Sequence, residues 1–180
     1  GLMLASIRRI PSADRDIKAG MFSESYKAYR QRGLRNLEDY HVGIVGLGNI
    51  AIELVKRLKA FNCKISYYGH NRKEDLEKEL DIDYLDLEEL FKTCDIISLH
   101  VPHTEETEHM INKETISLMK DDVIIVNTAR GKVIKQDDLT EALLKGKIGG
   151  AALDTLDMEP PNPEDPILHL PKEIDDKLIL

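Results

Sequence analysis

Residues 42–51 read Val-Gly-Ile-Val-Gly-Leu-Gly-Asn-Ile-Ala, and this stretch decides the fold of the chain. An apolar strand runs into Gly46-x-Gly48-x-x-Ala51, and an amphipathic helix follows. Gly46 suits a tight turn, Gly48 has no Cβ to block a close approach, and Ala51 lets the helix pack on the strand. Such a turn predicts a dinucleotide site, with the pyrophosphate on the free N–H groups of the helix. The alternative is a tight turn without a ligand, but the flanking strand and helix favour the site.

Short apolar runs alternate with amphipathic stretches from residue 41 onward. Most runs are rich in Ile, Val or Tyr, as buried parallel strands are. They cover residues 41–45, 64–68, 95–101, 123–127, 148–153 and 177–180, with a weaker alternating run at 81–85. This alternation predicts an α/β fold with a doubly wound, mainly parallel sheet of six to seven strands, of the Rossmann type. The expected strand order is 3-2-1-4-5-6, with 81–85 as the short third strand and 177–180 beyond the sixth.

Helical spacing of apolar residues predicts helices after residue 48, around 87–91 and around 139–144. Asp86 is expected to cap the second of these, with Glu89 completing a capping box. Residues 2–10 predict a short helix stopped by Pro11, and residues 12–40 are polar and irregular apart from a helix around 24–31. The proline-rich stretch from 160 to 171 predicts a loop.

The composition narrows the class of protein. The chain has 180 residues, and 25 Lys and Arg against 33 Asp and Glu give a net charge of −8. This balance argues against nucleic-acid binding, which needs clustered basic side chains. No apolar run approaches the roughly 18 residues of a membrane helix, and the N-terminus lacks a signal-peptide layout. Cys63 and Cys94 have no metal-ligand spacing and are expected as buried apolar residues, so we expect no metal and a cytoplasmic location.

The end of the second predicted strand, about 20 residues after the glycines, is where a dinucleotide's ribose is selected. No Asp or Glu stands there, and Gly69 occupies the position. The residues that follow are His70, Asn71, Arg72 and Lys73. This cluster predicts a pocket for a 2′-phosphate, and hence NADP rather than NAD. The alternative is a solvated basic loop balanced by Glu74 and Asp75.

Three later segments also follow predicted strands: residues 100–107, residues 126–131, and residues 151–160, which include Asp154 and Glu159-Pro160. Together with the glycine turn, in this order and at this spacing, they resemble the nucleotide-binding domain of the D-isomer-specific 2-hydroxyacid dehydrogenase family. The resemblance covers essentially the whole chain. It implies an oxidoreductase that binds NAD(P) and transfers a hydride between the nicotinamide and a small 2-keto or 2-hydroxy acid.

The resemblance also implies residue roles. Cofactor contacts would come from Gly46, Gly48, Asn49 and Ile50 at the pyrophosphate, Val101, Pro102 and Thr107 at the adenosine, Thr128 and Ala129 at the nicotinamide, and Asp154 at its carboxamide. Arg130 would bind the substrate carboxylate with its planar fork and polarise the carbonyl. Glu159 would hydrogen-bond the catalytic histidine and raise its pKa. The alternatives without a functional role are a surface ion pair for Arg130, a turn cap for Asp154 and an ordinary loop position for Glu159.

The remaining histidines carry less signal. His100 lies in an apolar strand and is expected to be packed and hydrogen-bonded. His103 stands where the family more often has an apolar residue, so it is expected either to touch substrate or cofactor or to be exposed. In the family, the catalytic histidine follows the last strand seen here, and a substrate domain precedes this one. The sequence is therefore expected to be an excised domain or the product of a shortened gene, which binds nucleotide without turnover.

The family resemblance further implies an assembly. Residues 1–40 are expected as a connecting helix and dimerisation arm, and residues 41–180 as the dinucleotide-binding domain of a homodimer. A nucleotide-sensing, corepressor-like regulatory module of the same superfamily is the alternative function. A methyltransferase with a glycine-rich loop fits poorly, since it gives no reason for Arg130 and Glu159.

Overall fold

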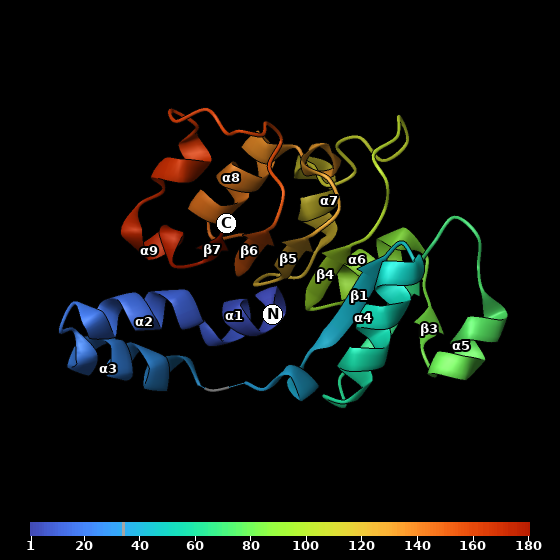
Figure 1. Cartoon of the computed structure of the whole chain (residues 1–180), viewed down its shortest axis with the longest axis horizontal. Helices are drawn as coiled ribbons and strands as arrows, with labels where there is room; N and C mark the ends of the chain where they lie inside the picture. Colours follow the sequence, from blue (N-terminus) through green and yellow to red (C-terminus); the bar gives the residue numbers. More distant parts are fainter. Residues whose placement is uncertain (34) are drawn as a thin grey trace.

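The computed structural model describes residues 1–33 and 35–180, and in this part of the chain seven strands pair in one parallel sheet (Figure 1). The strands are β1 (His41–Val45), β2 (Lys64–Tyr68), β3 (Asp83–Tyr84), β4 (Ile96–Leu99), β5 (Ile124–Asn127), β6 (Gly150–Leu153) and β7 (Leu178–Ile179). Their order is β3-β2-β1-β4-β5-β6-β7. This confirms the predicted topology, including the short third strand at one edge and the last strand at the other.

The central strands are buried on both faces, which explains their continuous apolar runs. In β1, Val42 pairs in register with Ile65 of β2 and Ile96 of β4. Every residue of β4, β5 and β6 is buried. Because β1 lies between β2 and β4, the strand order reverses direction at its carboxyl end, where open α/β sheets bind ligands.

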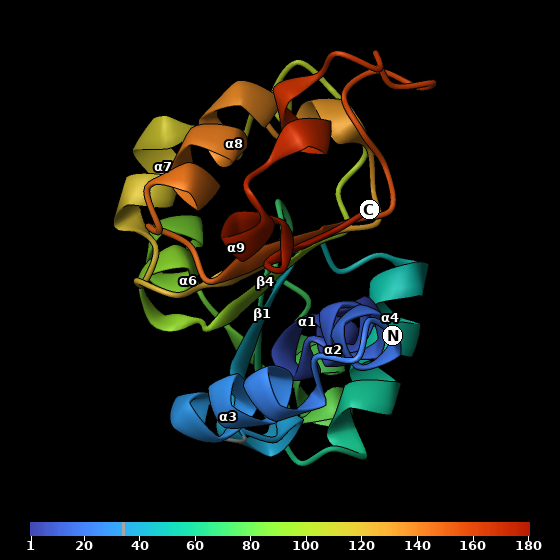
Figure 2. The ribbon, with the colours of Figure 1, turned by 90° about the vertical axis from the view of Figure 1, so that its left-hand side faces the viewer.

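Helices cover both faces of the sheet (Figure 2). They are α1 (Leu2–Arg8), α2 (Ile10–Lys18), α3 (Phe22–Arg32), η1 (Leu37–Asp39), α4 (Asn49–Lys59), α5 (Glu74–Leu80), α6 (Leu87–Thr93), α7 (Lys113–Leu118), η2 (Gly131–Val133), α8 (Gln136–Leu144), η3 (Pro166–His169) and α9 (Lys172–Asp175). One apolar core joins α6, α7 and α8 to the sheet, and a second joins α1, α4 and α5 to the opposite face.

The two cysteines belong to these cores, as expected from the sequence. Both are buried free thiols. Burial raises the pKa of the Cys94 thiol to about 12, which leaves it protonated and unreactive at neutral pH. No helix within residues 1–33 or 35–180 is long and apolar enough to cross a membrane.

The N-terminal segment is more helical than predicted. Pro11 does not stop a helix; it lies in the first turn of α2, where its missing N–H has no partner to lose. The break falls instead at Arg9, whose φ of 46° separates α1 from α2. The expectation that residues 12–18 are irregular is therefore wrong, whereas residues 19–21 are a turn between α2 and α3. The Asp176 side chain pairs with Arg15, which ties α2 to the C-terminal part of the chain.

Two smaller expectations are also wrong. Asp86 precedes α6, but its side chain makes no capping hydrogen bond, so the capping box with Glu89 does not form. The burial of Leu90 and Phe91 holds this short helix on the sheet instead. The proline-rich stretch contains η3, because a proline such as Pro166 is tolerated at the start of a helical turn, and it ends at Pro171 directly before α9.

Candidate functional site

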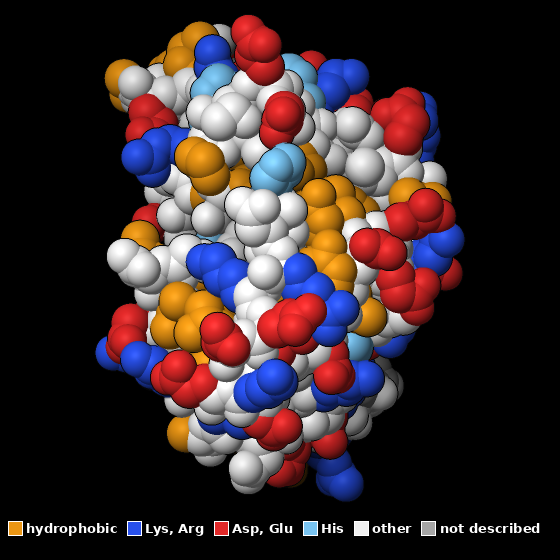
Figure 3. All heavy atoms as spheres, turned by 90° about the vertical axis from the view of Figure 1, so that its right-hand side faces the viewer, with side chains coloured by type: hydrophobic (Ala, Val, Ile, Leu, Met, Phe, Trp, Pro, Cys, Tyr) orange, Lys and Arg blue, Asp and Glu red, His pale blue; other side chains and the backbone are white. Residues whose placement is uncertain are grey.

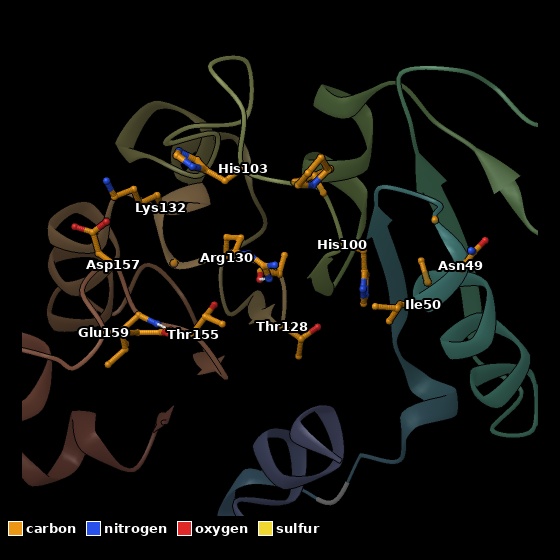
Figure 4. A pocket seen from close by; sticks show the side chains of 17 residues that line it. Asn49, Ile50, His100, His103, Thr128, Arg130, Lys132, Thr155, Asp157 and Glu159 are labelled. Atoms are coloured by element: carbon orange, nitrogen blue, oxygen red, sulfur yellow. Dashed lines mark hydrogen bonds between the residues drawn. The ribbon is translucent and has the colours of Figure 1, made fainter.

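The carboxyl ends of four neighbouring strands surround a pocket of about 1000 Å³. Figure 4 shows its labelled side chains: Asn49 and Ile50 after β1, His100 and His103 after β4, Thr128, Arg130 and Lys132 after β5, and Thr155, Asp157 and Glu159 after β6. Each strand contributes through the loop that follows it. The pocket therefore lies where a doubly wound sheet binds its ligands.

The glycine turn forms one side of this pocket and fits a dinucleotide. Gly46 has a φ of 94°, and a Cβ there would lie 2.9 Å from the backbone of His100. At Gly48 no atom lies within 4 Å of the place a Cβ would take, so the space above the turn is open. The α4 helix starts directly after Gly48 without a side-chain cap, which leaves its first N–H groups for a ligand.

A buried asparagine shapes the loop after β5. The Asn127 side chain donates from Nδ2 to the Arg130 carbonyl (2.9 Å) and accepts the Ala129 N–H at Oδ1 (3.0 Å). Gly131 then lets this loop touch the loop after β6, since a Cβ there would lie 1.8 Å from the Leu156 carbonyl oxygen. The role of Asn127 was missed at the sequence level, although an Asn that bonds the backbone two residues on is a known turn signal.

Arg130 and Glu159 line the same pocket, as the resemblance implied. Within the described residues Arg130 forms no ion pair, and its Nη1 donates only to the Ala129 carbonyl (2.7 Å). This counts against the surface-pair alternative. Glu159 accepts the Leu156 N–H at Oε1 (3.1 Å), so it also holds its own loop.

Other predicted cofactor residues lie at differing places around the pocket. Val101, Pro102 and Ala129 line it. Asp154 lies in an adjoining groove of about 670 Å³, which Thr128 and His100 also line. Thr107 lines neither cavity. Its hydroxyl accepts the Thr104 N–H (2.8 Å) and donates to the Pro102 carbonyl (2.6 Å), so it stabilises the loop after β4.

The two histidines differ. His100 is partly buried with Nε2 2.9 Å from the Ser98 hydroxyl, and burial lowers its pKa, so it is a neutral, hydrogen-bonded residue as expected. His103 is exposed at the pocket, with Nε2 3.7 Å from Glu108 Oε1. Thr155 was missed by the sequence analysis because a single Thr carries no signal. Its buried Oγ1 has no hydrogen-bond partner in the described part of the chain.

The predicted 2′-phosphate cluster lies beside the glycine turn. Lys73 Nζ donates to the Leu47 carbonyl (2.6 Å), which joins the cluster to that turn. Arg72 binds the Glu77 carboxylate through Nε (3.0 Å) and Nη2 (2.9 Å). The ion-pair partner of Arg72 is therefore Glu77 rather than Glu74 or Asp75. His70 and Asn71 are exposed in the same loop.

Comparisons with known proteins agree with this geometry. A family model for the D-isomer specific 2-hydroxyacid dehydrogenase, NAD binding domain, matches residues 1–174. A glyoxylate reductase of Korarchaeum cryptofilum is 43% identical over 169 residues, covering 94% of this chain and 51% of that protein. A hydroxypyruvate reductase of Thermotoga maritima is 44% identical over 164 residues, covering 91% and 51%.

The fold comparison gives the same result. The crystal structure of a D-lactate dehydrogenase from Aquifex aeolicus, complexed with NAD and lactic acid, matches with a TM-score of 0.85 at 36% identity, covering 99% of this chain and 55% of that one. The chain thus spans about half the length of these relatives. Since both the family model and the strand-end motifs extend over nearly all of it, this chain belongs to the D-isomer-specific 2-hydroxyacid dehydrogenase family, as its NAD-binding domain.

Proposed function

We propose that this chain is the cofactor half of an enzyme that transfers a hydride between NAD(P) and a small 2-keto or 2-hydroxy acid. The observation that carries the proposal is the Arg130 guanidinium in the pocket beside the glycine turn, which forms no ion pair with any described residue. The relatives named above are reductases and a dehydrogenase, which supports an enzyme rather than the regulatory alternative.

In this proposal the pocket residues divide the work. Gly46, Gly48, Asn49 and Ile50 hold the pyrophosphate, and Thr128, Ala129 and Asp154 surround the nicotinamide, which supplies or accepts the hydride when bound. Arg130 binds the substrate carboxylate bidentately and polarises the reacting carbonyl. Glu159 orients the catalytic histidine of the family and stabilises its protonated form. The 180 residues alone are proposed to bind nucleotide without turnover.

The test is Arg130→Ala in the whole enzyme, assayed with glyoxylate and hydroxypyruvate. Loss of two charge-assisted hydrogen bonds should lower kcat/KM by about 10²- to 10⁴-fold. Lys132→Ala removes a charge from the same pocket and should change kcat/KM by less than about threefold. Nucleotide affinity should stay constant in both variants. An Arg130→Ala enzyme with undiminished kcat/KM would contradict the proposal.

We propose NADP(H) as the preferred cofactor. Gly69 leaves the ribose end without the Asp or Glu that repels a 2′-phosphate. Support comes from Lys73, whose ammonium lies against the glycine turn, and from Arg72 in the same loop. Val101, Pro102 and Thr107 are proposed for the adenosine side.

We also propose a cytoplasmic homodimer in which residues 1–40 form the arm and residues 41–180 the cofactor domain. The free cysteines suit a reducing compartment. Large apolar side chains are exposed on α2 and α3: Ile10, Ile17, Phe22 and Tyr26, each more than half accessible. Covering them in a second copy would remove them from water. Light scattering tests this, and a monomer would count against it.

A further inference from the structure

The side chain of Arg72 is held in one orientation although it is half exposed. Its Nε and Nη2 donate to Oε1 and Oε2 of Glu77, a side-on, bidentate arrangement. Its guanidinium carbon lies 5.3 Å from the centre of the Tyr84 ring. The side-on pair uses only one edge of the guanidinium, so the N–H groups of Nη1 and the outer one of Nη2 stay free for another anion.

Glu77 is itself fixed. Only 13% of its side chain is exposed, and the hydroxyl of Tyr67 donates to its Oε1 (2.8 Å). The Tyr67 hydroxyl in turn accepts the backbone N–H of Lys73 (2.8 Å). Tyr67 is the last residue but one of β2 and is fully buried, edge-on against Tyr84. A continuous path of hydrogen bonds therefore runs from the loop backbone through Tyr67 and Glu77 to Arg72.

The negative charge of Glu77 could either oppose or support the binding of a 2′-phosphate. A carboxylate near the ribose end normally disfavours a 2′-phosphate. Both oxygens of Glu77 are occupied, however, and the hydrogen bonds from Arg72 hold its pKa below the usual range, so the pair is jointly neutral. Lys73 adds a cation beside the glycine turn, and it forms no ion pair within residues 1–33 and 35–180. The face that carries α5 has basic and acidic side chains interspersed, so the site is not set by bulk positive charge (Figure 3).

We infer that Glu77 and Tyr67 are positioning residues for cofactor selectivity: they hold the free edge of Arg72 where it meets the 2′-phosphate of NADP(H). The carboxylate nearest the site then favours the phosphorylated cofactor instead of repelling it. The inference rests on the proposed preference for NADP(H) and names two residues that determine it.

The competing hypothesis is that Glu77 neutralises Arg72 and keeps it from the phosphate. The two hypotheses predict opposite changes in NADPH affinity when Glu77 loses its charge. In titrations of the chain with NADPH and NADH, positioning predicts that Glu77→Gln weakens NADPH binding about five- to tenfold, although a negative charge is removed. NADH affinity should stay within about twofold, which also shows that the variant is folded. Tyr67→Phe should weaken NADPH binding by about two- to threefold.

Glu74→Gln is the matched control, since Glu74 lies on the same helix and acts on Arg72 only through its field. It should leave NADPH affinity unchanged or slightly tighter. Tighter NADPH binding in Glu77→Gln, or unchanged selectivity, would overturn the inference alone. Equal affinities of the unmodified chain for NADPH and NADH would overturn the proposed cofactor preference, and the inference with it, before any variant is made. An equal loss for both nucleotides would mean that Glu77 is only structural.

Discussion

The two ends of the proposed cofactor site are built by different means. At the glycine turn the site is made of backbone: a positive φ at Gly46, open space over Gly48 and the start of α4. At the ribose end it is made of side chains that position one another, with Arg72 on Glu77 and Lys73 on the turn. A backbone site has few substitutable parts and binds any dinucleotide, whereas a side-chain site can change selectivity without disturbing the fold.

The largest expected effect comes from placing a charge in the backbone-built end. Gly48→Asp has room for its side chain and an allowed backbone, with φ −87°. Its carboxylate would face the pyrophosphate, so NADH and NADPH affinity should both fall by about a hundredfold, or roughly 2.7 kcal/mol. As an N-cap it should raise the unfolding free energy by about a few tenths of a kcal/mol. Calorimetric titration measures the nucleotide affinities, and thermal unfolding measures the change in stability.

Gly48→Asn is the control for Gly48→Asp, because it caps the helix with the same shape but no charge. It should lose clearly less affinity than the Asp variant. A Gly48→Asp chain that still binds both nucleotides would show that the pyrophosphate lies elsewhere.

The next effect is confined to the side-chain end. The chain should bind NADPH more tightly than NADH by about tenfold, which needs only about 1.4 kcal/mol. Arg72→Ala should remove most of this difference and leave NADH affinity unchanged, since NADH has no phosphate to meet the guanidinium. Added salt should shrink the preference, because the contacts are exposed. Equal affinities for NADPH and NADH, or tighter binding of NADH, would mean that residues 70–73 are only a solvated loop.

The smallest expected effect is a pH dependence of the preference for NADPH, which arises at the side-chain end alone. A phosphate monoester takes up a proton near pH 6, so the preference for NADPH should fall by about two- to threefold as the pH drops from 7.5 to 5.5. Glu77 does not titrate in this window, because Arg72 keeps its pKa below the ordinary value for Glu. NADH affinity should stay flat. A preference that grew on acidification would show that a protein side chain, not the phosphate, controls the ribose end.

The same contrast explains what could be predicted from the sequence. The strand order and the glycine turn follow from local patterns, since buried parallel strands need apolar runs and the turn needs Gly46. Glu77 could not be predicted as the partner of Arg72, because Glu74 and Asp75 are equally good candidates in the sequence. The hydrogen bond from the Tyr67 hydroxyl that orients Glu77 is visible only in the folded chain. The α2 helix was missed because Pro11 is a breaker inside a helix but a good residue in its first turn.

The close approach of Gly131 to Leu156 has a mechanical consequence. The loop after β5 and the loop after β6 meet through their backbones at Gly131 and Leu156. No flexible side chain lies between the two backbones there to absorb a displacement. We therefore expect Arg130 and Glu159, one on each loop, to move together when the pocket opens or closes. Their spacing should then vary less than the distance from either residue to the glycine turn.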